Sequence, residues 1–166
     1  MDLLSLSREL EYLQTHKVEM GILSIDKDKT NKSGATILEY AVYNEFGTDN
    51  IPARPFMRRA IKHNKDTIKK YIDERIKEVT TGHLTGKQAY IHIGNFVCGL
   101  IIKQIQGATH WAVPLKKSTM TAKLKKGANN FRILLDERAL IAAIRYQITD
   151  KNGTVEHLSE YYYRGG

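Results

Sequence analysis

Cysteine and proline are scarce in this chain. Its 166 residues include one cysteine and three prolines. A single cysteine cannot form a disulfide within the chain, so no disulfide framework holds the fold. Cys98 lies in an uncharged run with helical periodicity, where we expect a small buried hydrophobic residue. This cysteine usage fits a reducing compartment.

Long hydrophobic runs are also missing. The longest stretch without a formal charge, Gln88 to Ile102, is shorter than the roughly 20 residues that a helical membrane span needs. The N-terminal leucines are followed at once by Arg8, Glu9 and Glu11, which is unlike a secretory signal. We therefore expect neither a membrane span nor a cleaved signal.

No catalytic, cofactor-binding or metal-binding pattern stands out. None of the six histidines has the spacing to a cysteine or acid that a metal site needs. Asp26 and Asp28 lack the glycine and the final glutamate of a calcium loop. Thr85-Gly86-Lys87 has no glycine-rich phosphate loop before it. The sequence predicts no enzyme and no cofactor, although catalytic groups that converge from distant positions stay an alternative.

The composition is otherwise that of an ordinary soluble domain with a basic balance. Hydrophobic residues make up 42% and charged residues 27% of the chain. The length predicts one domain, residues 1–166, which hides about two thirds of its unfolded surface. The net charge of +8 raises nucleic acid as a partner. An acidic protein partner, or solubility alone, fits it equally.

Three stretches have the periodicity of helices. Asp2 to Gln14, within an N-terminal segment 1–16, carries a leucine stripe that we expect to pack on its own domain, with a neighbouring subunit as the alternative. Pro55 to about Thr80 predicts one long helix with an apolar face. Thr85 to Gln106 is the most apolar stretch and predicts the core helix, antiparallel to the previous one. Its Gly94 and Gly99 indicate the close approach of another backbone.

Strands are expected on both sides of these helices. Val18 to Ile25 is rich in strand-forming residues, and Ile144 to Thr149 alternates apolar and polar residues. A turn at 150–153 and a returning strand, Thr154 to Leu158, complete a hairpin. The sequence therefore predicts an α+β fold, with two long helices packed against a small antiparallel sheet. Residues 26–35 and Lys116 to Lys126 are expected as long polar and basic loops.

The stretch from Tyr40 to Arg59 combines aromatic residues, glycine and proline. A short helix, Ile37 to Phe46, is expected to end at Gly47. Two prolines then stiffen the loop, and Pro55 is suited to the first position of the next helix. We expect the stretch to form a corner between two helices. The aromatic residues expected to pack where these elements meet are Tyr40, Tyr43, Phe46 and Phe56.

This corner also resembles a known family. Asn44 to Thr48 (NEFGT) and Ile51 to Arg58 (IPARPFMR) are similar to a signature of minor tail components of tailed bacteriophages, called head–tail joining, neck or tail-completion proteins. A looser second block begins at Trp111 and includes Pro114, Leu115, Thr119 or Thr121, lysines, Leu134-Leu135-Asp136, Leu140, Ile144 and Tyr146. Glu137 and Arg138 stand where the family tends to have Thr-Gly.

The resemblance implies a structural virion protein rather than an enzyme. Proteins of this family sit at the head-proximal end of the tail and join it to the head connector. They are usually rings, often hexamers, so the implied partners are further copies of the chain, tail tube or terminator proteins and connector proteins. The implied location is the virion neck, after assembly in the bacterial host cytoplasm.

The same resemblance assigns candidate contact residues. The corner residues are Phe46, Gly47, Ile51, Pro52, Arg54, Pro55 and Phe56. Arg54 either bridges to a carboxylate of a neighbouring subunit or makes a local bond within its own domain. A second contact region is expected at Trp111, Pro114 and Leu115. The C-terminal segment, 159–166, has three consecutive tyrosines, which predict either a partner contact or a loose end.

A basic DNA-binding protein is the alternative from another class. Residues 116–126 carry five lysines, Lys116, Lys117, Lys123, Lys125 and Lys126, and no acid. Lys123, Lys125 and Lys126 are the candidate phosphate contacts. No aromatic residue is interleaved to stack on bases, so the contact would be to the backbone and independent of sequence.

Overall fold

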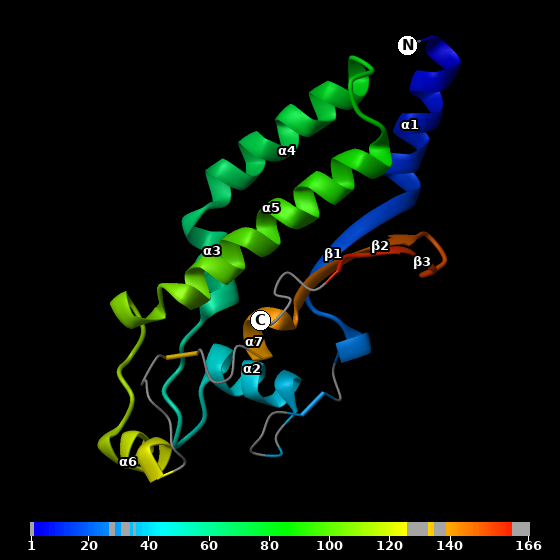
Figure 1. Ribbon diagram of the computed structural model, residues 1–166. Coiled ribbons are helices and arrows are strands. Elements are labelled where there is room, and N and C mark those ends of the chain that lie inside the picture. Colours follow the sequence, from blue (N-terminus) through cyan, green and yellow to red (C-terminus); the bar gives the residue numbers. More distant parts are fainter. Residues whose placement is uncertain are drawn as a thin grey trace.

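A computed structural model describes residues 2–26, 29–30, 34, 36–125, 133–134 and 139–160. Its helices pack with a small antiparallel sheet that lies beside α5, which is the α+β fold predicted from the sequence (Figure 1). The helices are α1 Leu3–Thr15, α2 Ile37–Phe46, α3 Phe56–His63, α4 Lys65–Thr80, α5 Gly86–Gln106, α6 Lys117–Lys125 and α7 Ala139–Ala142. The strands are β1 His16–Ile22, β2 Ile144–Asp150 and β3 Val155–Leu158. Asp136 of the second resembling block and the three tyrosines of the C-terminal segment lie outside the described residues.

Side-chain caps set the starts of three helices. The carboxylate of Asp2 accepts a hydrogen bond of 2.7 Å from the backbone N–H of Ser5 at the start of α1. At α5, Thr85 forms a capping box in which its hydroxyl and the Gln88 side chain each accept a bond from the other residue's backbone N–H. Thr36 does the same for α2. Such caps satisfy backbone donors that have no partner inside the helix. Asp2 and Thr85 are residue types that favour this position, so these two caps could be expected from the sequence.

The predicted single helix from Pro55 to Thr80 is wrong at its middle. Asn64 separates α3 from α4, with φ of −112° and ψ of 15°. Its side-chain amide donates a hydrogen bond of 2.8 Å to the carbonyl of Ala60, which offers the backbone an alternative to the helical ladder. The break leaves Ile61 exposed, although the apolar pattern placed it on the buried face.

The sheet is antiparallel, as predicted, and its strand order is β1-β2-β3. Val18 pairs with Ile148, and Gln147 pairs with Leu158. The hairpin turn is held by Asp150, whose carboxylate accepts bonds from backbone N–H groups two and four residues on. Ile144, Tyr146 and Ile148 all lie buried, so the alternation of β2 correctly gave its core face.

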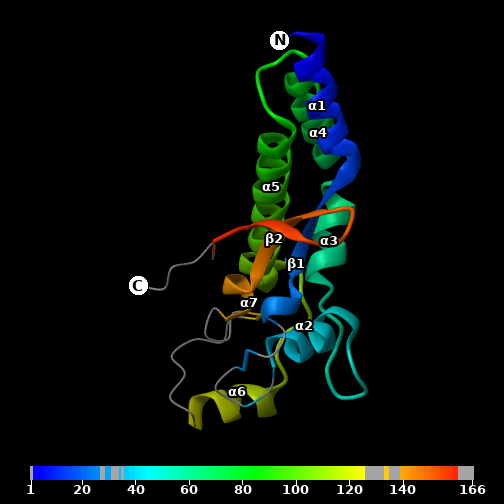
Figure 2. The same ribbon diagram turned by 90° about the vertical axis from the view of Figure 1, so that its right-hand side faces the viewer.

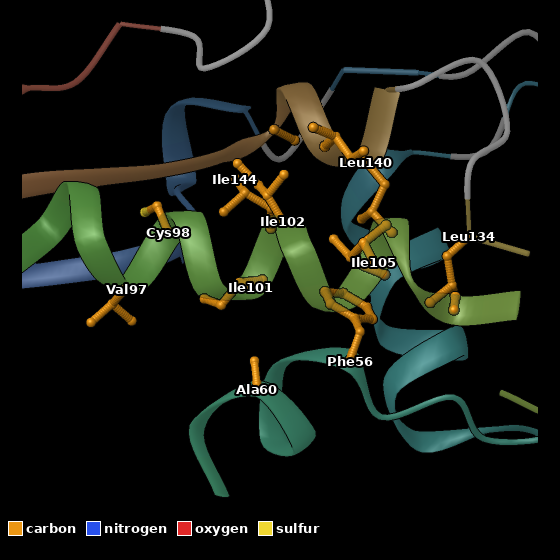
Figure 3. Close-up of a cluster of buried hydrophobic side chains, with 14 of the residues drawn as sticks. Phe56, Ala60, Val97, Cys98, Ile101, Ile102, Ile105, Leu134, Leu140 and Ile144 are labelled. Carbon is orange, nitrogen blue, oxygen red and sulfur yellow. The ribbon is translucent and has the colours of Figure 1, made fainter. Parts of the chain in front are cut away.

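Helix α5 is the centre of the core. It runs antiparallel to α4, with α3 and α4 on one side and strands β1 and β2 on the other (Figures 1 and 2). Figure 3 shows its buried side chains meeting those of α3, α7 and β2. Phe56, Ile105, Leu140 and Ile144 are among the fully buried members of this cluster.

A glycine lets α5 approach the sheet. A Cβ atom placed on Gly94 would lie 2.4 Å from two ring carbons of Tyr146. Real Cβ atoms do not come that close, and Tyr146 is itself buried, so its ring has little room to move. Gly94 therefore accommodates an aromatic ring, whereas the sequence led us to expect another backbone there.

Gly94→Ala should destabilise the fold. The added methyl group overpacks the contact with Tyr146, which costs about 1–3 kcal/mol, against the roughly 1 kcal/mol that alanine gains over glycine within a helix. Thermal and urea unfolding measure the difference.

Gly107→Ala is the matched control at the other end of the same helix. Its added Cβ atom would lie at an ordinary 3.4 Å from the Lys103 carbonyl oxygen. Its stability should stay near that of the wild type. Equal stability of the two alanine variants would contradict the assigned role of Gly94.

Candidate interaction site at the α2–α3 corner

The corner begins where α2 ends at Gly47. The backbone of Gly47 has a φ of 79°, a region that side chains disfavour, and its N–H donates to the carbonyl of Tyr43 at 2.9 Å. A Cβ atom at this position would lie 3.0 Å from the backbone nitrogen of Ala53. Thr48 and Ile51 then exchange backbone hydrogen bonds of 2.8 and 3.2 Å. Helix α2 therefore ends where the sequence predicted, and the loop folds back tightly on itself.

The buried carboxylate of Glu45 joins the two helices. It accepts hydrogen bonds from the backbone N–H groups of Met57 and Arg58, each 2.9 Å long, and from Nε of Arg58 at 3.0 Å. Arg58 also donates to the carbonyl of Glu45. Helix α3 has no side-chain cap of its own at Pro55. Glu45 therefore acts as its cap from a different helix, with its negative charge at the positive end of the helix dipole.

Arg54 ties the corner to the segment after α5. It is buried, and it donates hydrogen bonds to the carbonyl of Val113 at 3.0 Å and to the side-chain oxygen of Asn44 at 3.3 Å. Burial lowers the pKa of this guanidinium from its usual value. Of the two roles left open for Arg54, the structure contains the local bond within its own domain.

The second predicted contact region meets the first through this bond. Trp111 is half-buried, and its indole N–H donates to the carbonyl of Gln104 at 3.0 Å. The guanidinium of Arg59 lies over the indole ring, 5.1 Å from its centroid. Leu115 packs partly against the core, while Pro114 is exposed. The start of the second block, Trp111 to Leu115, thus lies beside the first block.

The aromatic residues of the corner divide into two groups. Phe56 is fully buried, as predicted. Tyr43 is exposed and Phe46 is 64% exposed, so the prediction that they pack where the elements meet is wrong. The guanidinium of Arg58 lies 4.6 Å from the centroid of the Phe46 ring, a cation–π contact. Phe46 therefore belongs to the surface of the corner rather than to its core.

An apolar groove lies beside these exposed residues. Its volume is about 240 Å³, and its walls come from β1, α2 and the start of α3. We call it the α2 groove, formed chiefly by Met20, Ile22, Leu38, Val42, Phe46 and Met57. Leu38, Val42 and Phe46 recur every four residues along α2, a spacing that could have revealed this face from the sequence. Its one charged lining residue, Glu45, already has its hydrogen bonds.

The lysine-rich stretch differs from its prediction. Residues Lys117–Lys125 form helix α6, where we expected a loop. The helix has no buried residue and no acid, and it lies at the end of the molecule away from the N-terminus (Figures 1 and 2). Lys125 is exposed, Lys123 is half-buried, and Lys126 lies outside the described residues.

Reactive groups are few in the described part of the chain. No three histidine, cysteine or acidic side chains gather there as metal ligands. The Cys98 thiol is buried as predicted, and burial raises its pKa to about 12, so it stays protonated and unreactive near neutral pH. No helix among these residues is both long and apolar enough to span a bilayer.

Comparison with known proteins gives no relative. No family model, no curated protein and no solved structure matches the chain. Its function has therefore to be inferred from its own residues and their geometry.

Glu45→Gln should weaken the corner. Glutamine keeps the shape but turns one acceptor oxygen into a donor that faces the N–H groups of Met57 and Arg58. The lost charge-assisted bonds and the unpaired donor should lower the free energy of unfolding by about 2 kcal/mol. Urea denaturation measures this loss.

Glu74→Gln is the matched control. Glu74 lies exposed on α4, and its carboxylate is 3.9 Å from the guanidinium of Arg75. Exposed ion pairs contribute little, so this variant should unfold like the wild type. If Glu45→Gln were as stable as Glu74→Gln, the carboxylate of Glu45 would not be the cap of α3.

Proposed function

We propose that this chain is a structural protein of a tailed-phage virion, a tail-completion or neck protein at the head–tail junction. It forms a ring, with a hexamer favoured, at the head-proximal end of the tail and joins that end to the head connector. The observation that carries the proposal is that the start of the second resembling block lies against the corner formed by the first, linked by the bond from Arg54 to the carbonyl of Val113.

The corner supports an assembly role because its polar signature residues are bonded within the chain while several of its apolar residues are exposed. The polar residues of the signature are bonded within the chain, as the contacts of Glu45 and Arg54 illustrate. They hold α2 and α3 in a fixed relation. The apolar residues left outside, among them Val42 and Phe46, form a surface rather than a reaction site. Groups arranged in this way suit recognition of another protein.

The mechanism is the matching of preformed surfaces. Copies of the chain associate with one another, and the ring then offers repeated contacts to tail tube or terminator proteins on one side and connector proteins on the other. Repetition around the ring multiplies weak individual contacts into a stable joint. No covalent chemistry is needed, and assembly takes place in the cytoplasm of the bacterial host.

Deletion of the gene in the phage or prophage that encodes it tests this function. Electron microscopy of the lysate should show filled heads beside separate, unjoined tails. A wild-type copy supplied in trans should restore joined particles. Intact, infectious particles from the deletion strain would contradict the proposal.

A sequence-independent DNA-binding protein is the second candidate, and helix α6 is the observation that favours it. Lysines on a helix with no acid and no buried residue are well suited to contact phosphates. A neck protein can also meet DNA as it passes, so modest binding alone does not separate the two functions.

Salt-dependent binding to duplex DNA checks this candidate. If α6 contacts phosphates, Lys117→Glu with Lys125→Glu should weaken binding and reduce the slope of log affinity against log salt by about one per lost contact. The matched control, Lys65→Glu with Lys70→Glu, reverses two exposed lysines of α4 and should leave that slope unchanged. Equal effects of the two pairs would exclude a specific role of α6.

A further inference from the structure

Helix α1 presents an apolar face that nothing in the described chain covers. Leu3 is 86% exposed, Leu4 is 64% exposed, and Leu10 is also exposed. Leu3 and Leu10 are two helical turns apart and so lie on the same side of the helix. Leu6 and Leu13 lie on the same stripe but are half-buried, and α1 contacts α4 and α5. The prediction that the leucine stripe packs on its own domain is therefore met only in part.

The α2 groove is the second uncovered apolar surface. Leu38, Val42 and Phe46 are all exposed and lie in one row along α2, next to the hollow. Single exposed apolar residues are normal, but a continuous row beside an apolar hollow marks a contact surface. The hollow, at about 240 Å³, is smaller than the roughly 300–1,000 Å³ of small-molecule pockets. It suits a few apolar side chains of a partner, as a helix laid in a groove supplies.

The charges beside the two surfaces are complementary. Helix α3, which forms one wall of the groove, carries Arg58, Arg59, Lys62 and His63 and no acid. On α1, by contrast, Asp2 and Glu11 are exposed beside the leucines, and with Glu9 they outnumber the one basic residue of the helix, Arg8. An acidic helix with an apolar face is thus the kind of partner that the groove attracts, and a basic helix would be repelled. The chain contains such a helix in α1.

A single copy cannot bring these surfaces together. Figures 1 and 2 show α1 with the N-terminus toward one end of the molecule and α2 toward the other. Helix α1 continues into β1 without a linker, and the Tyr90 hydroxyl donates to the carbonyl of Leu13 at 2.7 Å. The backbone N–H of Gly86 also donates to the carboxylate of Glu9 at 2.7 Å. The helix is therefore fixed far from the groove of its own chain.

We infer that α1 of one copy docks in the α2 groove of the next copy. The two surfaces differ, so the contact is head-to-tail, and repetition of such a contact closes a ring when the rotation between copies allows it. The inference rests on the proposed function in that it names the contact of the proposed ring. The apolar leucines enter the groove, and the acids of α1 lie near the basic residues of α3.

Two surface variants of the full chain test this contact. Leu3→Glu with Leu10→Glu removes the helix face, and Val42→Glu with Phe46→Glu removes the groove face. All four side chains are exposed, so both variants should keep the wild-type circular dichroism and stay folded, with a small loss in melting temperature where Phe46 leaves its contact with Arg58. Light scattering should give a mass above that of a dimer for the wild type and a monomer mass for each variant. Leu124→Glu, an exposed leucine of α6, is the control that should keep the wild-type mass.

Mixing the two variants decides the geometry. Each variant retains the surface that the other lacks, so one intact helix can enter one intact groove. An equimolar mixture should therefore form a dimer of unlike copies and nothing larger. A monomeric wild type, a variant that keeps the wild-type mass, or a mixture that stays monomeric would each overturn the inference.

These outcomes are distinguishable from failure of the proposed function. Light scattering of the purified chain reports on the contact whether or not the chain belongs to a virion. Deletion of the gene reports on head–tail joining whatever contact the copies use. A monomeric protein whose deletion leaves tails unjoined would remove the contact and keep the neck role.

Discussion

The buried carboxylate of Glu45 is the constraint on which the corner depends. A buried acid is unfavourable unless charged or polar partners surround it, and here the start of α3 supplies them. The same contact provides the cap that α3 lacks at Pro55. Because Glu45 and Asn44 face inward, the opposite side of α2 has to face outward. One ion-paired side chain thereby fixes both the angle between two helices and the apolar surface they expose.

The corner is held against the rest of the fold by α5 and its continuation. Phe56, the last of the corner residues, is buried in the cluster built around α5, while Arg54 binds the segment that follows that helix. At its other end α5 is joined to α1 by hydrogen bonds that Tyr90 and Gly86 donate. Helix α5 thus fixes the distance between the exposed leucines of α1 and the α2 groove. In the proposed ring, a rigid spacer of this kind would favour one defined geometry between neighbouring copies over a range of loose associations.

Local signals made much of the fold predictable. The bounds of α2 follow from Thr36 and Gly47, and the hairpin follows from alternation and the turn at Asp150. The break at Asn64 was not predicted because the apolar pattern continues through it, whereas the break is accompanied by a single side-chain hydrogen bond from Asn64. Helix α6 was not predicted because it has no buried residue and therefore no periodic apolar face in the sequence. The sequence singled out the corner, but the prediction that Phe46 is buried was wrong. Its aromatic character suggested burial, whereas the side of α2 that is buried depends on the partners of Glu45, which lie more than ten residues away in the sequence.

A cryo-EM map of the neck in an intact particle tests the central claim most directly. If the proposed function and the proposed contact are both right, the map should show a closed ring of this chain at the head-proximal end of the tail. In that ring, the leucines of α1 from each copy should lie in the α2 groove of the next. Absence of the chain from the neck, or a ring whose contacts leave both surfaces open to solvent, would contradict it.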